Sequence, residues 1–509
     1  MMMAFDDSNL ENAATRLSRG SGGSTVVFEN QKRLHKGARI AIVALLFCAA
    51  ALLEPVRFHS VTYEVWGHLR GGEWILRNHA IPRSGIFSRN SAAGWIDLYW
   101  LYQALLAMFF KVLGLRAIPC VSMLVTTMLA MWTYLIASRK NASFLAPLAL
   151  SGIALVIMNR GTEQGMISAL FFSVELWVVA QYRSNPRTRW QWLLLPLFCI
   201  WANVNPGFVF GLFFLSLLAI VDLFSMLRGA GSVAGRTWLL LVGTGVATLC
   251  SPYMFAGWGE AWTELYSQTS IRYVAETRPM AFRDPLDYVA MLFVMGSLTV
   301  LGYRRKCDLF DLAAIAGTML VAFRFPREFW LVTLCCVFAL SNSNAGYESS
   351  SKKSLSKDHW REWTIIGVIV VVALLVSVAC MPGDLKLLSK KSGLNLPITA
   401  CDAIRSDSLP GPIFNAYQWG GFLMWYLPEY PVAIDSRIGL YGDEQNRTYF
   451  DLILGKASLE QTPVFATANT LLLDTGSDLT QALIKVPQLS AQFHIVYQDA
   501  MATVFTRVN

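Results

Sequence analysis

Apolar runs of roughly the length needed to cross a lipid bilayer recur along most of this chain, and they constrain its fold more than any other feature. A membrane-spanning helix needs roughly 17–25 mostly apolar residues. Runs of this kind, several of them shorter, lie near 38–54, 117–137, 142–158, 164–181, 191–203, 205–227, 237–252, 286–303, 309–323, 328–341 and 363–381. They predict a mainly α-helical, polytopic membrane bundle of about eleven spans.

The charges support this prediction and give the bundle an orientation. Only 15% of the residues are charged and 54% are hydrophobic, whereas a soluble protein carries about 25% charged residues. Lys and Arg gather in short loops, which favour the cytoplasmic side: Arg139-Lys140, Arg183 to Arg189, Arg228 to Arg236, Arg304 to Lys306 and Lys352 to Arg361. The net charge of +8 therefore favours membrane lipids as partners. It does not indicate nucleic acid.

Three regions follow from this topology. Residues 1–37 are polar, with a Gly/Ser run, and are predicted to form a disordered cytoplasmic tail. Residues 38–381 form the membrane body, with an outer loop at 55–97. Because Leu98 to Leu113 is apolar as well, either this stretch or 117–137 is expected to be interfacial or re-entrant.

Residues 382–509 read as a small α/β domain outside the membrane. Helical patterns at 443–453 and 479–484 alternate with runs that resemble strands. These strand-like runs are 411–417, 431–435, 469–474, 495–498 and 502–506.

The outer loop opens with a cluster of ionisable and aromatic residues, Tyr63 to Arg70, next to the membrane surface. Glu64 and His68 are four residues apart, so they share one face of a helix. A carboxylate in this position can take a proton from a hydroxyl group, and His68 can assist or orient it. The alternative is an interfacial helix that is anchored by its tryptophans and whose charges are only solvated.

Asp97 lies where the chain returns to the membrane. It is a candidate second carboxylate that could hold a divalent cation together with Glu64 or position an acceptor. It could equally cap the helix that follows, because Asp is favoured at helix starts.

Basic and amide side chains fall on the same predicted outer side: Arg160, Arg324, Arg327 and Asn203. The arginine fork fits phosphate oxygens and keeps its charge in a low dielectric, which makes a lipid phosphate a plausible ligand. In the alternative, Arg327 pairs with Glu328 or Glu276, and the other arginines reach toward lipid head groups.

The residues also resemble a group of bacterial multi-span proteins similar to the GT-C glycosyltransferases. In the body the resemblance is carried by Glu64 to Trp74, His79 to Pro82, Phe87-Ser88, Trp95 to Leu101, Trp201 to Asn203, Ser251 to Tyr253 and Arg324 to Glu328. In the tail it is carried by Phe414 to Gly421, Ile434 to Arg437, Tyr441 to Glu444 and Val504-Phe505. The chain departs from the group at Asn205-Pro206, where His-Gly is expected, and at Gly161, where Pro often stands.

The resemblance implies an enzyme that takes a sugar from a polyprenyl-phosphate carrier, with an acidic residue in the first outer loop. In this chain that residue is Glu64. It would act as general base on an acceptor hydroxyl, while arginines stabilise the leaving phosphate, with or without a metal. The resemblance also implies a bacterial cytoplasmic membrane, with the tail outside.

Two questions stay open at the level of sequence. Asp435 and Arg437 in the tail either recognise the acceptor or form a pair that fixes a loop. The main rival to an enzyme is a transporter, or an assembly subunit whose outer domain binds a protein partner. An enzyme predicts that Glu64, Asp97 and the arginines line one cavity.

Overall fold

The computed structural model describes residues 41–43, 45, 62–89, 93–140, 144–158, 163–229, 234–266, 272–273, 280, 282–303, 308–342, 368, 371–372, 375–457, 459 and 462–508. The predicted tail 1–37, most of the apolar run 38–54, part of the apolar run 363–381, and Arg160 lie outside these residues.

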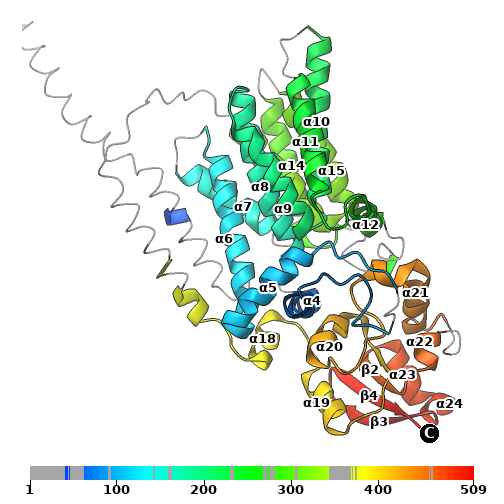
Figure 1. Cartoon of the computed structure of the whole chain (residues 1–509). Helices are drawn as coiled ribbons and strands as arrows, with labels where there is room; N and C mark the ends of the chain where they lie inside the picture. Colours follow the sequence, from blue (N-terminus) through cyan, green and yellow to red (C-terminus); the bar gives the residue numbers. More distant parts are fainter. Residues whose placement is uncertain are drawn as a thin grey trace, which may run out of the picture.

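Nine helices of the body correspond to the predicted apolar runs, and they lie side by side in Figure 1. They are α6 (Ala117–Ala137), α7 (Leu145–Met158), α8 (Glu163–Ser184), α9 (Leu194–Val204, after the 3-10 turn η2, Trp190–Leu193), α10 (Phe208–Leu227), α11 (Ala234–Thr248), α14 (Pro285–Gly302), α15 (Leu309–Arg324) and α16 (Phe329–Asn342).

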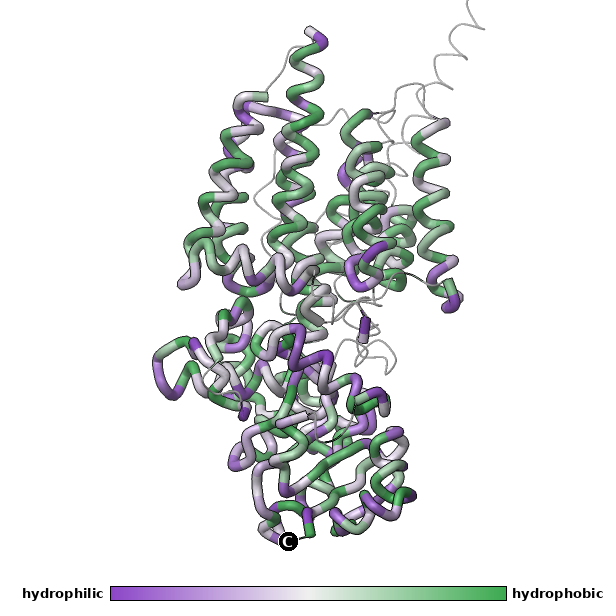
Figure 2. Tube along the Cα trace, turned by 90° about the vertical axis from the view of Figure 1, so that its right-hand side faces the viewer, coloured by the Kyte–Doolittle hydropathy of each residue, from purple (hydrophilic) through white to green (hydrophobic). Residues whose placement is uncertain are grey.

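Four helical stretches of the described chain are long and apolar enough to cross a membrane: Trp100–Ala137, Gly165–Ser184, Phe208–Leu227 and Pro285–Gly302. Leu145–Met158 and Trp190–Val204 are shorter apolar helices. The bundle is predominantly hydrophobic in Figure 2, whereas the tail is mixed. A helical membrane fold is therefore confirmed, while the count of about eleven spans stays a prediction.

Helix α16 is at the centre of the bundle. Twelve of its residues are buried, and it packs against α6, α7, α8, α14 and α15, as expected for a helix that is apolar all round. In contrast, α11 and α14 expose large side chains such as Val242, Val246, Leu292 and Met295. These outer faces suit contact with lipid.

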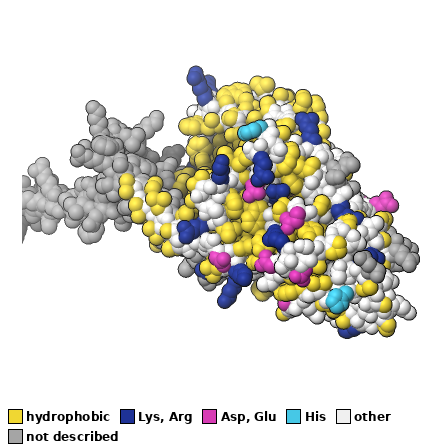
Figure 3. Space-filling model, turned by 60° about the horizontal axis from the view of Figure 1, so that its bottom comes forward, with side chains coloured by type: hydrophobic (Ala, Val, Ile, Leu, Met, Phe, Trp, Pro, Cys, Tyr) yellow, Lys and Arg dark blue, Asp and Glu magenta, His cyan; other side chains and the backbone are white. Residues whose placement is uncertain are grey.

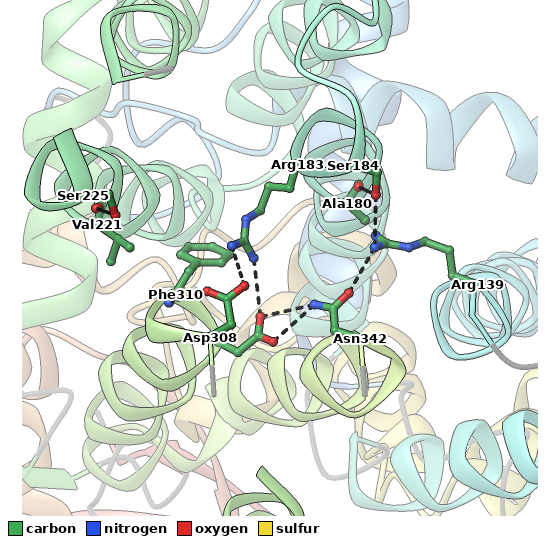
Figure 4. Close-up of polar contacts among 10 residues, drawn as sticks. Arg139, Ala180, Arg183, Ser184, Val221, Ser225, Asp308, Phe310 and Asn342 are labelled. Atoms are coloured by element: carbon green, nitrogen blue, oxygen red, sulfur yellow. Dashed lines mark hydrogen bonds and ion pairs between the residues drawn. The ribbon is translucent and has the colours of Figure 1, made fainter. Parts of the chain in front are cut away.

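A polar network joins the helix ends at the pole of the bundle away from the tail (Figure 4). Arg183 of α8 forms an ion pair with Asp308, with a nitrogen–oxygen distance of 2.6 Å, at the start of α15. Arg139 at the end of α6 donates a hydrogen bond to Asn342 of α16, which in turn donates to Asp311. The structure thus brings two of the predicted cytoplasmic loops together at one end.

Two helices lie across the opposite end, next to the tail. Helix α5 (Trp100–Leu113) runs obliquely to α6, to which it is joined by the 3-10 turn η1 (Gly114–Arg116), and α4 (Glu64–Asn78) packs against α5 (Figure 1). The expectation that one of these two segments is interfacial stays a prediction. Helix α12 (Phe255–Tyr266) and the 3-10 turn η4 (Pro326–Glu328) lie at the same end.

The tail contains a four-stranded sheet of order β1-β2-β4-β3. The strands are β1 (Ile413–Asn415), β2 (Thr470–Asp474), β3 (Phe493–Gln498) and β4 (Ala502–Arg507). Strands β1 and β2 are parallel, and the other two pairings are antiparallel. The helices are α18 (Leu385–Ser392), α19 (Ile398–Ser406), α20 (Gly420–Tyr426, after the 3-10 turn η5, Tyr417–Trp419), α21 (Ile438–Ile453), α22 (Pro463–Ala466), α23 (Asp478–Lys485) and α24 (Pro487–Ser490).

Successive side chains of a strand point to opposite sides of a sheet, and strands β1, β2 and β4 are buried on both sides, whereas most of β3 is half-buried or exposed. Leu472 and Val504 pack toward the core that includes α20 and α4, while Leu471 and Phe505 pack toward α21 and α23. The prediction of a strand at 431–435 was wrong. Apart from an isolated bridge between Val432 and Ser88 of the outer loop, this segment is irregular.

Candidate functional site

A cavity of about 210 Å³ lies where α4, the outer loop, α12 and η4 meet the tail. Of the predicted site residues, Glu64, His68, Arg327 and Arg437 line it. The other ionisable side chains in its wall are Tyr99, Glu260, Glu264, Tyr417 and Asp443. The body and the tail therefore build one site together.

Glycines set the position of α4, the helix that carries Glu64 and His68. A Cβ atom on Gly71 or Gly72 would overlap Gln103 of α5, so only glycine lets α5 approach this closely. On the other side, a Cβ on Gly421 of α20 would lie 3.1 Å from the Tyr63 carbonyl oxygen and 3.2 Å from the Gly67 nitrogen. The tail thus packs directly on the helix that holds the predicted base.

Aromatic packing adds to this docking. The buried Trp66 ring lies 5.5 Å from Phe422 and 4.9 Å from Trp425 between ring centroids. Both partners belong to α20, and such pairs contribute about 0.5–1.5 kcal/mol each beyond their buried area. Trp66 therefore helps to hold the tail against α4. Its role is not limited to anchoring α4 in the membrane interface, which was the alternative.

Glu64 is in the first turn of α4, where the helix dipole favours a carboxylate. Its charge acts on two other residues of the cavity wall. Burial is the main cause that raises the pKa of Tyr99, and the charge of Glu264 raises it further. The charge of Glu64 adds to this rise. Burial alone would lower the pKa of Arg327, but Glu328, Glu264, Tyr99 and Glu64 raise it.

His68 is joined to Asp97 through Gln103. The Gln103 amide nitrogen donates to Asp97 Oδ1 at 3.0 Å and lies 3.3 Å from His68 Nδ1. Burial lowers the pKa of His68 to about 4, so its ring is neutral at pH 7. It can orient a neighbour by hydrogen bonding, but it brings no positive charge to the cavity.

Asp97 is fully buried behind this wall and is not among the residues that line the cavity. Its Oδ1 also accepts the backbone N–H of Tyr99 at 3.0 Å, which fixes the turn just before α5. The N-cap residue of α5 is Tyr99, and no side chain makes a capping hydrogen bond there, so Asp97 does not cap this helix. Burial raises its pKa to about 7, against the opposing effects of the Tyr99 backbone N–H, Arg437 and Gln103.

Arg327 lies among carboxylates. Its Nε is 3.1 Å from Glu328 Oε1, as the pairing alternative predicts. Glu264 accepts a 2.6 Å hydrogen bond from the Tyr99 hydroxyl. Burial raises the pKa of Glu264, and the charge of Arg327 opposes that rise. Arg327 thus both pairs with Glu328 and faces the cavity.

The tail contributes a buried ion pair. Arg437 binds Asp435 with both Nε and Nη2, at 2.8 and 2.7 Å, and Tyr441 donates to the same carboxylate at 2.6 Å. The guanidinium lies 4.8 Å from the centre of the Trp95 ring. Its buried Nη1 has no hydrogen-bond partner among the described residues. Asp435 and Arg437 therefore form the loop-fixing pair, and Arg437 still borders the cavity.

Two further predicted residues lie away from the cavity. Asn203 accepts a hydrogen bond from Trp100 and donates to the carbonyl oxygens of Cys199 and Cys250, so it ties α9 to α5 and to the end of α11. The Arg324 guanidinium lies over Phe325. Neither residue is part of the cavity wall.

Several polar residues of the site were not predicted from the sequence, among them Gln103, Glu260 and Glu264. The two glutamates are four residues apart in the segment between the apolar runs 237–252 and 286–303. That is the same spacing that drew attention to Glu64 and His68, and it could have identified them. Nothing in the local sequence of α5 marks Gln103.

The divalent cation that Glu64 and Asp97 could hold together stays a prediction. Asp97 does not reach the cavity. In the part of the chain that the structure describes, no group of three or more His, Cys, Asp or Glu side chains is placed to hold a metal ion.

Comparison with known proteins gives matches in structure only. No protein-family model matches the chain, and no curated protein sequence matches it. Among solved structures, the oligosaccharyltransferase AglB from Archaeoglobus fulgidus, in complex with an inhibitory peptide and a dolichol-phosphate, aligns with 86% of this chain and 69% of its own, at 10% identity and a TM-score of 0.52.

Two other structures match equally widely. The oligosaccharyltransferase of Archaeoglobus fulgidus in its apo form aligns with 87% of this chain and 70% of its own, at 10% identity and a TM-score of 0.51. ArnT from Cupriavidus metallidurans, bound to undecaprenyl phosphate, aligns with 91% of this chain and 97% of its own, at 13% identity and a TM-score of 0.51. These proteins are GT-C glycosyltransferases, so the resemblance found in the sequence is confirmed for the fold.

Proposed function

We propose that this protein is a membrane glycosyltransferase that moves a sugar from a polyprenyl-phosphate carrier to an acceptor. One observation carries the proposal: Glu64 of α4, Arg327 of η4 and Arg437 of the tail come from three separate parts of the chain and line one cavity. A carboxylate and guanidinium groups that face a common space are what a displacement at a sugar phosphate requires. The GT-C fold supports this assignment.

In the proposed reaction an acceptor hydroxyl attacks the anomeric carbon in line with the leaving phosphate. Glu64 takes the hydroxyl proton while the new carbon–oxygen bond forms and the bond to the phosphate oxygen breaks. The phosphate leaves on its lipid with an added negative charge. General-base assistance of this kind contributes roughly 10²–10⁴-fold to the rate.

Arg327 is the proposed partner of the leaving phosphate. Its charge is already shared with Glu328 and Glu264, so a bound phosphate would compete with these carboxylates. Burial raises the pKa of Glu264. A protonated Glu264 would no longer attract Arg327, which could then bind the phosphate. Arg437 Nη1, buried and without a described partner, is proposed to bind a hydroxyl of the sugar.

His68, Gln103 and Asp97 are proposed as positioning residues. The neutral His68 ring and the Gln103 amide hold one wall of the cavity next to Glu64, and Asp97 fixes Gln103 from behind. Asp97 therefore acts through Gln103 and does not contact the substrate.

The membrane orientation follows from the basic loops. We propose that the chain lies in the bacterial cytoplasmic membrane with its N terminus in the cytoplasm, so that the cavity and the tail face the outer side. The donor then reaches the cavity from the membrane, and the acceptor from the outer leaflet or the solvent.

Substitution of Glu64 tests the proposal. The gene is deleted in its native host and replaced by wild type, Glu64→Gln or Glu73→Gln, the last being a control on the same helix. Sugars of the cell surface and polyprenyl-phosphate sugars of the membrane are then measured by mass spectrometry.

We expect deletion and Glu64→Gln to remove one sugar from the cell surface and to increase its polyprenyl-phosphate form, while Glu73→Gln behaves as wild type. Each variant must reach the membrane in normal amount, which an immunoblot checks. A scaffold would tolerate the Glu64→Gln and Arg327→Gln substitutions together, and wild-type glycans in that double variant would refute the proposed enzymatic function.

A further inference from the structure

We infer that the acceptor is a carbohydrate chain that enters from the aqueous side through a groove next to the cavity. This inference rests on the proposed function. The groove has a volume of about 440 Å³ and is lined by Arg83, Gly94, Trp95, Ile96, Tyr253, Glu260 and Gly439.

The groove continues into the cavity. Four residues, Trp95, Ile96, Glu260 and Gly439, line both spaces. Arg83, Gly94 and Tyr253 extend the groove outward along the outer loop and the segment before α12. A chain that lies in the groove would therefore bring its end to the space that Glu64 borders.

The opposite wall of the cavity leads toward the membrane helices. A small space of about 30 Å³ shares Tyr99, Glu264 and Arg327 with the cavity, and its other walls include Ser168 of α8 and Asn205 after α9. It has no lining residue in common with the groove. A lipid phosphate bound at Arg327 thus occupies the membrane side, which leaves the groove for the second substrate.

The chemistry of the groove suits a sugar chain. Trp95 and Tyr253 offer ring faces on which the C–H side of a pyranose can pack, and Arg437 stacks against the Trp95 ring and holds it in place. Arg83 and Glu260 offer planar polar groups that can bind pairs of neighbouring hydroxyls. Figure 3 shows that side chains of both charges lie on the end of the molecule that carries the tail.

Other acceptors fit this groove less well. A lipid chain would need an apolar channel, but Ile96 is the sole aliphatic residue among the seven that line the groove. An extended peptide commonly adds to a sheet edge, and no strand of the sheet β1–β4 contributes to the groove.

A substitution that fills the groove and leaves the cavity intact tests the inference. A Cβ atom on Gly94 would meet nothing within 4 Å, so Gly94→Trp adds a large side chain to the groove at little cost to the fold. Gly235→Trp is the matched control, because Gly235 is equally open and lies in the first turn of α11 at the far pole of the bundle. Arg83→Ala is a second, milder variant that touches only the groove.

Two measurements separate acceptor binding from donor chemistry. In the deletion host, each variant is assayed for the missing sugar in the polysaccharide, lipid and protein fractions of the cell surface. The purified full-length variants are then given the polyprenyl-phosphate sugar that accumulates in the deletion host, and its slow hydrolysis by water is followed.

We expect the deletion to remove the sugar from the polysaccharide fraction. Gly94→Trp should abolish transfer and Arg83→Ala should lower it about tenfold, the effect of one lost charged hydrogen bond. Both should hydrolyse the donor like wild type, and Gly235→Trp should be normal in both assays. Glu64→Gln should lose hydrolysis as well.

Three results would overturn the inference. Normal transfer by Gly94→Trp would show that the acceptor does not use the groove, and loss of the sugar from the lipid or protein fraction would show a different acceptor class. Both results leave the proposed transferase intact. If deletion changes no fraction and no lipid-linked sugar accumulates, the proposed function fails together with the inference.

Discussion

The buried carboxyl group of Asp97 makes the stability of this protein depend on pH. Asp97 Oδ1 accepts hydrogen bonds from the Tyr99 backbone N–H and the Gln103 amide, whereas its buried Oδ2 has no hydrogen-bond partner among the described residues. Because burial dominates, the pKa of Asp97 rises from the ordinary 3.8 to about 7. The folded protein therefore prefers the protonated form.

The sign of the effect follows from proton linkage. Between pH 3.8 and about 7 the folded state binds this proton and the unfolded state does not, so stability falls as the pH rises. Over the whole window of about three pKa units the loss is about 4 kcal/mol, at 1.36 kcal/mol per unit. A measurement from pH 5 to pH 8 covers about two pH units of this window, which corresponds to a loss of stability of about 3 kcal/mol.

Asp97→Asn removes the ionisable group and keeps its shape. The thermal unfolding midpoint of purified wild type and Asp97→Asn is measured from pH 5 to pH 8 by tryptophan fluorescence, with the exposed Asp407→Asn as control. We expect the midpoint of wild type to fall with rising pH relative to that of Asp97→Asn, while Asp407→Asn follows wild type. Parallel curves for wild type and Asp97→Asn would show that the Asp97 carboxyl group does not make stability depend on pH.

Two further predictions concern the tail. Gly421→Val should weaken its docking by about 1–3 kcal/mol, because the added side chain meets the Tyr63 carbonyl; proteolysis of the tail should become faster, whereas Gly235→Val, in open space, should have no such effect. Arg437→Met should destabilise the protein by about 3–5 kcal/mol, because it leaves Asp435 buried without its cation. Adding Asp435→Asn should restore much of the unfolding midpoint, and no recovery would mean that the pair is not the cause.

The docking of the tail bears on the function. Trp66, Gly67 and Gly421 lie at the contact between α4 and α20, so a shift of the tail would also move Glu64. Loss of sugar transfer in Gly421→Val, with the protein still present in the membrane, would therefore be expected even though Gly421 does not line the cavity.

Several elements could be predicted because they follow from short-range patterns. Apolar runs located α6 to α11 and α14 to α16 within a few residues, since a helix in lipid must be apolar over its length. The apolar residues Val61, Val65, Leu69, Trp74 and Leu76 fall roughly on one side of a helix and predicted α4, and short strand-like runs predicted β2 and β4. The run 431–435 resembled a strand equally well, but the prediction was wrong, because within this run Val432 alone pairs with a neighbouring backbone segment.

Residue type and spacing were enough to predict a helical membrane protein with an α/β tail and to single out Glu64, Arg327 and Arg437. That these three share a cavity, that Asp97, Arg324 and Asn203 lie outside it, and that Gln103, Glu260 and Glu264 belong to it became visible in the folded structure alone. The physical reason is that the wall is assembled from segments hundreds of residues apart. Their approach depends on glycine contacts between α4, α5 and α20, which no local pattern reveals.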